Sequence, residues 1–576
     1  MENENDAFSI IDYVVLGLML LISLAIGFYY ALFKKQNSAT EYLHGGKNMN
    51  FIAVSLSIVS SVISGVSLIS VPTEIYYYGS QQQLTFFTII LVGITSYYLI
   101  LPVFFKLQLT SIFKYFELRF NSKVKLFSSI LNTILMIIYS PIVVYAPGLI
   151  VSHVTKINVH YITPIICLVC ILYTVFGGIK AVIWTDALQS LIMIGSSATV
   201  IALGIIEHGG IGNVFKTNYE TGRFILKFDL DPTLRDTIWS LTFGTYFHVL
   251  GIYSFGQSTI QKYLSLKDFK DVKRTNIIAS FGLILVFFLC QLCGYVALAR
   301  YVFCDPKSVN KIQKPDQILP YYIMDLGKSF PGLAGIFVAG VISAGLSTLS
   351  AILNSLAATM YNDFLCNLLP NKIVKNHEAT TLKFLVAILG VLCVSMVYII
   401  EHLGTTLLPL VTTFLGLTSG PMVGLFFAGM LLPNINATSV LIGGVTSLVI
   451  LIWIVFTSQW YKTNKMLVYP TLNVYTNSCK FQTNDSSILL NPITNVTIND
   501  VPWIYRISHH LYPIIGVIVV VVISLIASYF FKNKEPVNED YLSPVVARYM
   551  RRKRYGKSAS YVSIEKAHLQ LNDLKD

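Results

Sequence analysis

Long apolar segments recur along almost the whole chain, and they constrain its fold more than any other feature. A helix rises about 1.5 Å per residue, so about 20 apolar residues cross the hydrocarbon core of a bilayer. About 13 such segments are present, near residues 10–33, 51–79, 83–106, 123–152, 160–176, 182–206, 237–257, 276–303, 333–364, 380–400, 406–431, 436–457 and 510–532. Backbone groups in lipid must hydrogen-bond within their own segment. The predicted fold class is therefore an all-α polytopic membrane protein with about 13 transmembrane helices.

The composition of the chain argues against a soluble protein. Of its 576 residues, 54% are hydrophobic and only 12% are charged, whereas soluble domains carry about 25% charged residues. The net charge of +12 does not indicate nucleic-acid binding, because the basic residues stand between apolar segments or in the tail. No P-loop and no organised nucleophile–base set is visible, so neither an ATP-driven pump nor an enzyme is expected.

Lysine and arginine residues predict which side of the membrane each end faces. An odd number of crossings places the two chain ends on opposite sides. With the N-terminus outside, the basic clusters near 262–274 and 548–557 lie inside, as basic residues beside membrane spans usually do. We therefore expect a multi-pass protein, in the plasma membrane, whose C-terminus is cytoplasmic.

The polar loop 458–509 lies outside in this topology. It contains two Asn-X-Ser/Thr sequons, at Asn484 and Asn495, which are candidate glycosylation sites. Cys479 lies in the same loop, and Cys304 follows an earlier apolar segment on the same side. A disulfide between these two cysteines is a hypothesis, since external loops meet an oxidising environment.

The second apolar segment has an organised polar face. Ser60, Ser64 and Ser67 share one side of a helix, and Gly65 and Pro72 weaken the helix around them. Such a segment can unwind locally and turn free carbonyl groups toward an ion. The alternative is that its small residues only allow neighbouring helices to pack closely.

The ninth segment carries a narrow polar stripe formed by Ser343, Ser347, Ser350 and Asn354, with Thr348 beside it. Hydroxyl oxygens suit a hard monovalent cation, whereas transition metals would prefer the His or Cys ligands that this stripe lacks. The alternative is a packing face whose hydroxyl groups bond to their own backbone.

Two further segments contain polar residues of uncertain role. In the glycine-rich seventh segment, His248 could hydrogen-bond a substrate carboxylate or hydroxyl, or be satisfied by a neighbouring helix. Asp186, near one end of the sixth segment, could bind a cation on its path through the protein. A simple interfacial anion is the alternative for Asp186.

Three motifs, in order along the chain, resemble the sodium:solute symporter family. They are GGIKAVIWTDALQSLIM (177–193), QSTIQKYLS (257–265) and GIFVAGVISAGLSTLSAILNSLA (335–357). In the second motif Lys262 stands where an Arg is usual. The resemblance covers roughly residues 8–532 and is greatest to the branch that carries monocarboxylates, vitamins and iodide.

The resemblance implies a LeuT-like core of two inverted five-helix repeats, at 51–206 and 237–431. An extra helix and linker (1–50) would precede them. Two C-terminal helices (432–532) and a basic cytoplasmic tail (533–576) would follow.

The resemblance also implies a sodium site. Ser347 and Thr348 would bind the ion through their hydroxyl groups, and Ala344 through its carbonyl group. Carbonyl groups of Ser60 and Ile63 would add ligands from the interrupted second segment. Asp186 matches an acidic residue linked to a second cation site in some members of the family.

By position, the substrate would lie between the interrupted segments, near Ser64, Ser67, Tyr145 and His248. Members that carry sugars or iodide have Gln where this chain has Ser67, and the sugar branch has an acidic residue where it has Val66. A monocarboxylate or a vitamin-like acid is therefore favoured over a sugar or iodide.

The predicted function is import of a small organic solute by sodium-coupled alternating access, with sodium as the co-transported ion and the bilayer as surroundings. One alternative is a transporter-derived sensor that signals without net flux. Another is a symporter for a sugar or an inorganic anion. An intramembrane enzyme would need a paired catalytic set at one depth, and none is visible.

Overall fold

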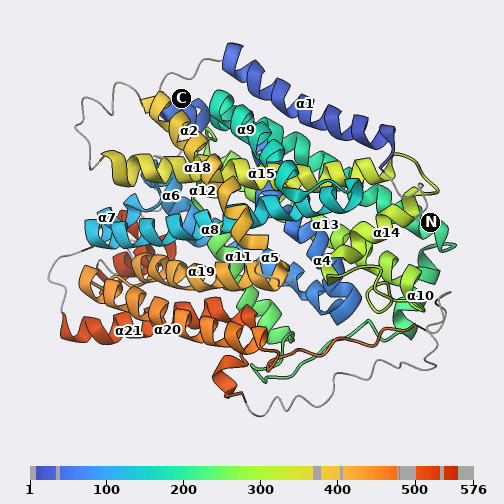
Figure 1. Ribbon diagram of the computed structural model, residues 1–576. Helices are drawn as coiled ribbons and strands as arrows, with labels where there is room; N and C mark the ends of the chain where they lie inside the picture. The colour runs from blue at the N-terminus through green and yellow to red at the C-terminus, as the bar shows by residue number, and fades with distance from the viewer. Residues whose placement is uncertain are drawn as a thin grey trace.

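The chain folds into a bundle of long, roughly aligned helices (Figure 1). The computed structural model describes residues 8–33, 39–366, 378–401, 407–476, 479, 501–531 and 537–554. Within these residues the secondary structure is helical, without a strand. The predicted all-α fold class is confirmed.

In the described part of the chain, 10 helices are long and apolar enough to cross a membrane, or 11 if a bent pair counts as one more span. The spans are α1 (Ile10–Phe33), the bent pair α3 (Phe51–Val62) and α4 (Gly65–Tyr78), the stretch Ser80–Leu107 that contains α5 (Thr85–Thr95) and α6 (Leu101–Leu107), α8 (Ser122–Thr155), α9 (Val159–Glu207), α13 (Phe269–Tyr301), α15 (Leu333–Thr359, continued to Leu365), α18 (Glu378–Glu401), α19 (Leu407–Leu431), α20 (Ala437–Thr463) and α21 (Tyr512–Phe530). Shorter helices connect them: α2 (Ala39–His44), α7 (Lys114–Arg119), α10 (Ile211–Glu220), α11 (Thr245–Tyr253), α12 (Gln257–Tyr263) and α14 (Ile318–Gly327).

Two elements account for the difference from the predicted number of spans. Helix α9 has 49 residues and a non-helical Gly178 (φ 53°, ψ −157°), and about 20 residues suffice for one crossing. It therefore joins the segments predicted at 160–176 and 182–206. The segment predicted at 237–257 contains a short π-helix, Ser240–Gly244, that runs directly into α11, and together they are shorter than one crossing requires. The total of 13 stays a prediction.

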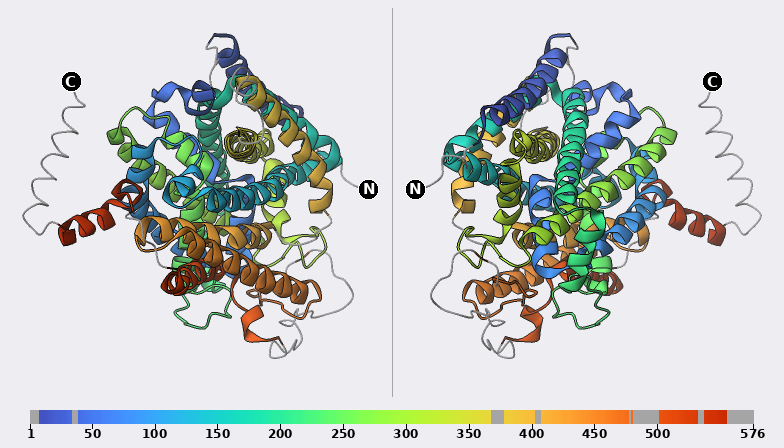
Figure 2. Two further views of the ribbon diagram at one scale, coloured as in Figure 1. Left: turned by 90° about the vertical axis from the view of Figure 1, so that its left-hand side faces the viewer. Right: turned by 90° about the vertical axis from the view of Figure 1, so that its right-hand side faces the viewer.

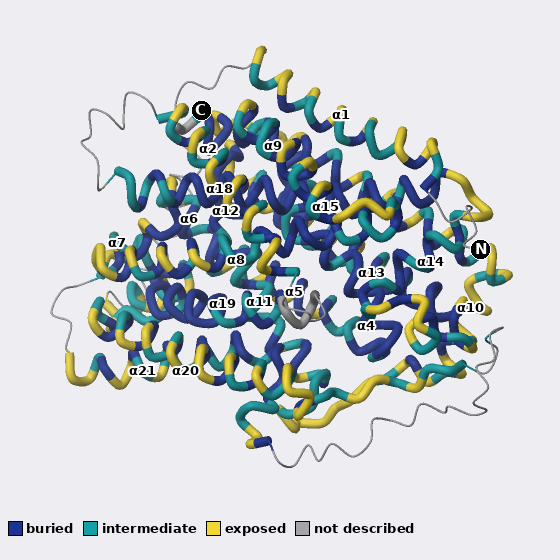
Figure 3. Tube along the Cα trace, in the orientation of Figure 1, coloured by how far each residue is buried: buried dark blue, intermediate teal, exposed yellow. Residues whose placement is uncertain are grey.

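Helix α15 lies at the centre of the bundle. It packs against α9, α8, α1, α18 and α3, and Figure 2, viewed along the helices, shows it surrounded by them. Figure 3 shows the contrast between this buried helix and the exposed outer faces of α1 and α21. Small residues allow the close packing, because a Cβ added at Gly340 would lie 2.0 Å from Ser196 Oγ on α9. A polar stripe on α15 is consequently shielded from lipid.

The second predicted segment is interrupted in its middle. Helix α3 ends at Val62, Ile63 and Ser64 are extended, and α4 continues at an angle of 59°. Gly65 opens α4 where a Cβ would lie 3.0 Å from the carbonyl oxygen of Val341. The backbone of α15 thus approaches closely at the interruption.

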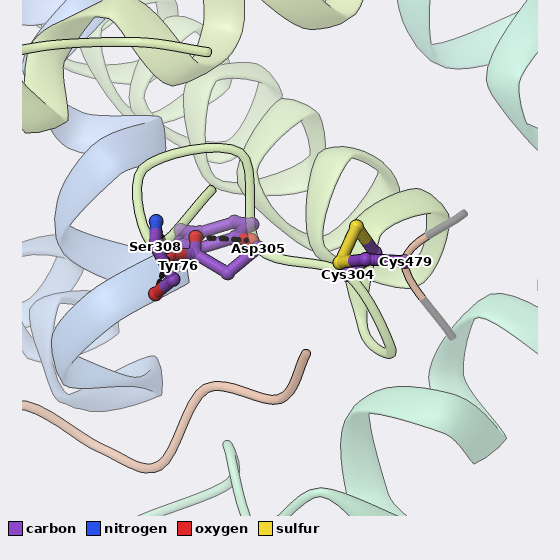
Figure 4. Close-up of a disulfide and its surroundings, with 5 residues drawn as sticks. All are labelled: Tyr76, Cys304, Asp305, Ser308 and Cys479. Atoms are coloured by element: carbon purple, nitrogen blue, oxygen red, sulfur yellow. Dashed lines mark hydrogen bonds between the residues drawn. A yellow bond between two sulfur atoms is a disulfide. The ribbon is translucent and has the colours of Figure 1, made fainter. Parts of the chain in front are cut away.

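One end of the bundle carries a disulfide, and we call it the disulfide end. Cys304, just after α13, is bonded to Cys479, and their Cα atoms lie 5.1 Å apart. Beside it, the carboxylate of Asp305 accepts hydrogen bonds from Tyr76 Oη at 3.0 Å and Ser308 Oγ at 2.7 Å (Figure 4). The hypothesised Cys304–Cys479 pair is therefore joined, and it ties the segment before residue 480 to the ends of α4 and α13.

Candidate functional site

The interruption between α3 and α4 exposes carbonyl groups to α15. In a continuous helix the carbonyl of Ser60 would accept a bond from the amide four residues later. Here Ser347 Oγ donates to it at 2.5 Å. Thr348 Oγ1 lies 3.4 Å from the carbonyl oxygen of Ser61 and 3.5 Å from that of Ser60.

The same two hydroxyl groups also face the carbonyl of Ala344, at 3.3 Å from Ser347 Oγ and 3.0 Å from Thr348 Oγ1. Predicted ligands Ser60, Ala344, Ser347 and Thr348 are thus brought together in one buried cluster. Ile63 lies at the interruption itself, with extended backbone (φ −94°, ψ 111°). Neutral oxygens packed this closely, without a carboxylate among them, suit a monovalent cation such as sodium.

Asp186, on α9, is fully buried and forms an ion pair. Its Oδ2 lies 2.8 Å from Lys262 Nζ on α12, and it accepts hydrogen bonds from Ser57 Oγ at 2.8 Å and Ser61 Oγ at 3.2 Å. The carboxylate is enclosed by the bundle. The positive group that faces it is an ammonium of the protein itself.

The ammonium group of Lys262, like the Asp186 carboxylate, has several hydrogen-bond partners inside the bundle. Its ammonium also donates to the carbonyl of Ser57 at 2.9 Å and to the hydroxyl of Ser61, which uses all three of its donors. Ser350 connects this ion pair with the buried cluster around Ser347, because its Oγ lies 3.4 Å from Asp186 Oδ1 and 3.0 Å from the carbonyl oxygen of Ser347. The ion pair and the buried cluster therefore both contact α15.

A cavity of about 110 Å³ lies on the other side of the interruption. Predicted substrate residues Ser64, Ser67 and His248 all line it, and so does Val66. Its further polar lining residues are Gln82, Thr85, Tyr139, Thr245, Thr412, His509 and His510. Apolar side chains form most of the remaining wall.

A second cavity, of about 80 Å³, lies beside the first. Its lining includes Ser61 and, from the buried cluster, Thr348. The two cavities share Val62 and Tyr139 in their linings. The predicted Tyr145 is buried on α8 but lines neither cavity, whereas Tyr139 on the same helix lines both.

Four residues of the ion pair and the cavity lining were not predicted from the sequence. Lys262 was visible only as an unusual residue in a motif. Tyr139 lies in a helix whose sequence shows no polar periodicity, and His509 and His510 stand directly before the last apolar segment. The candidate glycosylation sites Asn484 and Asn495 lie outside the described residues.

A buried ion pair lies on each side of the cavities. Toward the disulfide end, Arg235 Nη2 lies 2.8 Å from Glu74 Oε1. At the opposite end, Asp363 lies 3.4 Å from Lys125 Nζ and accepts from Ser111 Oγ at 2.8 Å. Glu74 and Asp363 are thus each paired with a cation from a different element of the bundle.

Comparison with known proteins places this architecture in one family. A profile of the sodium:solute symporter family matches residues 42–447. The chain is 32% identical over 558 residues to sodium-coupled monocarboxylate transporter 1 of Homo sapiens, which covers 93% of this chain and 91% of that protein. It is 34% identical over 458 residues to the sodium-dependent multivitamin transporter of Oryctolagus cuniculus, which covers 78% of this chain and 70% of that protein.

The fold is similar to those of solved transporters. A Na+-coupled sialic acid symporter in a substrate-bound outward-open state superposes with a TM-score of 0.74 at 23% identity, over 92% of this chain and 99% of that one. The nucleobase-cation-symport transporter Mhp1, in a closed conformation, gives 0.52 at 13% identity, over 87% of this chain and 96% of that one. This chain is a member of the sodium:solute symporter family.

Proposed function

We propose that this protein imports a small monocarboxylate together with sodium by alternating access. The observation that carries the proposal is the buried cluster of Ser60, Ala344, Ser347 and Thr348 oxygens, which joins an interrupted helix to the central helix beside a small cavity. Ile63, at the interruption, is the proposed fifth ligand through its carbonyl group.

Cavity size supports a small solute. The two cavities measure about 110 and 80 Å³, whereas pockets for drug-sized ligands are roughly 300–1,000 Å³. A two- or three-carbon acid suits this space better than a vitamin-sized acid. Val66 and Ser67 leave the nearby wall without the acidic and amide groups that the sugar branch carries there.

Coupling follows from where the ion would bind. Sodium at the cluster would hold α3 against α15, so it would stabilise only the conformation in which these helices meet. Such differential affinity is what allows an ion to drive a conformational change. Each sodium that enters with the membrane potential would add about 2.3 kcal/mol per 100 mV to uptake.

Asp186 is proposed as a second cation site, at which the ammonium group of Lys262 takes the place of an ion. A second sodium ion would have to displace an ammonium that lies 2.8 Å from the carboxylate and is buried with it. Moving the ammonium away from its three partners would leave it unpaired in the protein interior, which is costly. One sodium per cycle is therefore proposed.

The ion pairs at the two ends are proposed to act as alternating closures. Opening toward the disulfide end would separate Glu74 from Arg235, and opening toward the other side would separate Asp363 from Lys125. The repeats 51–206 and 237–431 are proposed as the bodies that move relative to each other.

The disulfide end is proposed to face outside the cell. Disulfides persist in oxidising compartments, and Cys304–Cys479 lies at this end. The N-terminus would then be external, Asn484 and Asn495 would be accessible to glycosylation, and the basic tail would be cytoplasmic at the plasma membrane.

The test is initial-rate uptake of radiolabelled lactate, pyruvate, biotin, glucose and iodide into proteoliposomes, with sodium or choline outside. We expect concentrative uptake of the short acids that requires sodium. If only glucose or iodide is taken up, that solute replaces the monocarboxylate as the proposed substrate. A conformational change on ligand addition without accumulation of label would favour a transporter-derived sensor.

A further inference from the structure

The first turn of the C-terminal helix forms part of the cavity wall. His509 and His510, in the turn His509–Leu511 that leads into α21, line the 110 Å³ cavity together with Pro513. The two histidines are only 2% and 7% exposed. They come from outside the two proposed repeats, so a helix beyond the core would complete the cavity.

Helix α21 is packed too tightly to be a peripheral attachment. A Cβ added at Gly420 of α19 would lie 2.8 Å from the carbonyl oxygen of Pro513, and one added at Gly244 would lie 2.3 Å from that of His510. Two glycines thus permit the backbone of this turn to approach the neighbouring elements. The position of the histidines is set by backbone contact.

Polar contacts orient His510 further. Its Nδ1 lies 3.4 Å from Thr245 Oγ1, and its Nε2 lies 3.3 Å from Asp236 Oδ1. Asp236 is in turn 3.6 Å from Arg235 Nη1, and Ser508 Oγ donates to the carbonyl of Arg235 at 2.5 Å. The turn is held to the 232–236 loop at the disulfide end.

His509 stacks on His510, with ring centroids 4.1 Å apart. His248 lines the same cavity, and its Nδ1 is buried without a hydrogen-bond partner. Three imidazole rings thus lie in the wall of one cavity.

A carboxylate accepts hydrogen bonds only, and charge-assisted bonds from imidazole N–H groups are among the stronger ones. We propose that His509 and His248 bind the carboxylate of the transported solute, while His510, whose two ring nitrogens face Thr245 and Asp236, packs against His509. This proposal rests on the proposed function and assigns the specificity for an acid to the C-terminal helix.

The experiment compares His509→Phe, which keeps a ring of similar size but removes the donors, with His509→Gln, which restores an N–H donor. The same pair is made at His248. The matched control is His208→Phe, at the end of α9, where Nδ1 lies 2.9 Å from the carbonyl oxygen of Gly204, away from the cavity. Full-length variants in proteoliposomes are assayed for KM of lactate, for competition by lactate against lactamide, and for sodium half-saturation.

We expect the His509→Phe and His248→Phe variants to raise the KM of lactate at least tenfold, which corresponds to about 1.4 kcal/mol. They should also lose the preference for lactate over lactamide, while sodium half-saturation changes less than twofold. The Gln variants should stay within threefold of wild type, and His208→Phe should match it.

The proposal is overturned if the Phe variants keep the preference for the acid, or if acid and amide weaken equally. Wild-type protein that takes up no carboxylate would overturn both the proposed function and this assignment. Wild-type uptake with unchanged Phe variants would overturn only the assignment.

Discussion

The Oγ of Ser347 lies 2.5 Å from the carbonyl oxygen of Ser60, although 287 residues separate them in the sequence. One partner is a side chain of the central helix α15. The other is a backbone group that an intact α3 would have kept for itself. The hydroxyl stripe on α15 therefore supplies the hydrogen-bond donor for a carbonyl group that the interruption at Ile63–Ser64 frees.

Replacing Ser347 and Thr348 by Ala should raise the sodium concentration for half-maximal uptake at least tenfold or abolish uptake. Both hydroxyl ligands would be lost, while the backbone carbonyls would remain. The measurement is uptake against sodium concentration. Ser395→Ala on the exposed face of α18, where Oγ bonds only to its own helix, is the control. Normal uptake by the double variant at low sodium would contradict the assigned site.

Lys262→Met should destabilise the protein strongly, because it leaves the Asp186 carboxylate buried without its counter-ion. Breaking a buried pair from one side costs about 3–5 kcal/mol. The double variant Lys262→Met with Asp186→Leu should recover much of this loss. Thermal unfolding of purified protein measures both effects.

The exposed pair Arg274–Asp271, at 3.2 Å, supplies a control for this prediction. Removing Arg274 should cost about 1 kcal/mol or less, since water and salt screen such pairs. If Lys262→Met instead raised the Hill coefficient for sodium without loss of stability, Asp186 would be able to bind a second sodium ion.

Gly420→Ala should lower stability, since the added Cβ would lie 2.8 Å from the Pro513 carbonyl oxygen and 3.1 Å from Gly516 Cα. Overpacking of this kind costs typically about 1–3 kcal/mol. Gly195→Ala is the matched control, because nothing lies within 4 Å of its added Cβ. Equal melting temperatures for the two variants would show that α19 and α21 are not in close contact.

The disulfide predicts a simple gel result. A protease site inserted after Asn464, which lies between Cys304 and Cys479 in sequence, should give fragments that separate only after reduction. Cys304→Ser should lower stability by about 2–4 kcal/mol, and Cys366→Ser, a cysteine outside any disulfide, is the control for it. Separation of the fragments without reductant would contradict the pairing.

Most of the helical framework was predictable. The segment predicted at 10–33 is α1, and the one predicted at 380–400 is α18, to within two residues at its start. Such segments are readable because a lipid-facing helix must be apolar along its whole length. The central helix was readable for another reason, since hydroxyl groups on an otherwise apolar segment need partners inside the protein.

Residues that line the cavity were predictable only in part. Ser64, Ser67 and His248 stood out because polar side chains are rare in these segments, and all three line the cavity. Tyr145 and Tyr139 are both on α8, and which of them lines the cavity depends on the rotation of that helix against its neighbours. No periodicity in the sequence specifies that rotation.

By itself, the sequence determined that this chain crosses a membrane many times as helices and which of those helices carry polar groups. Both follow from the free energy of placing single residues in hydrocarbon, which is a local property. Only the tertiary structure decided that Lys262 neutralises Asp186 and that His509 reaches a cavity lined by Ser64. These residues lie far apart along the chain, and they meet only through the packing of the whole bundle, which no local pattern in the sequence specifies.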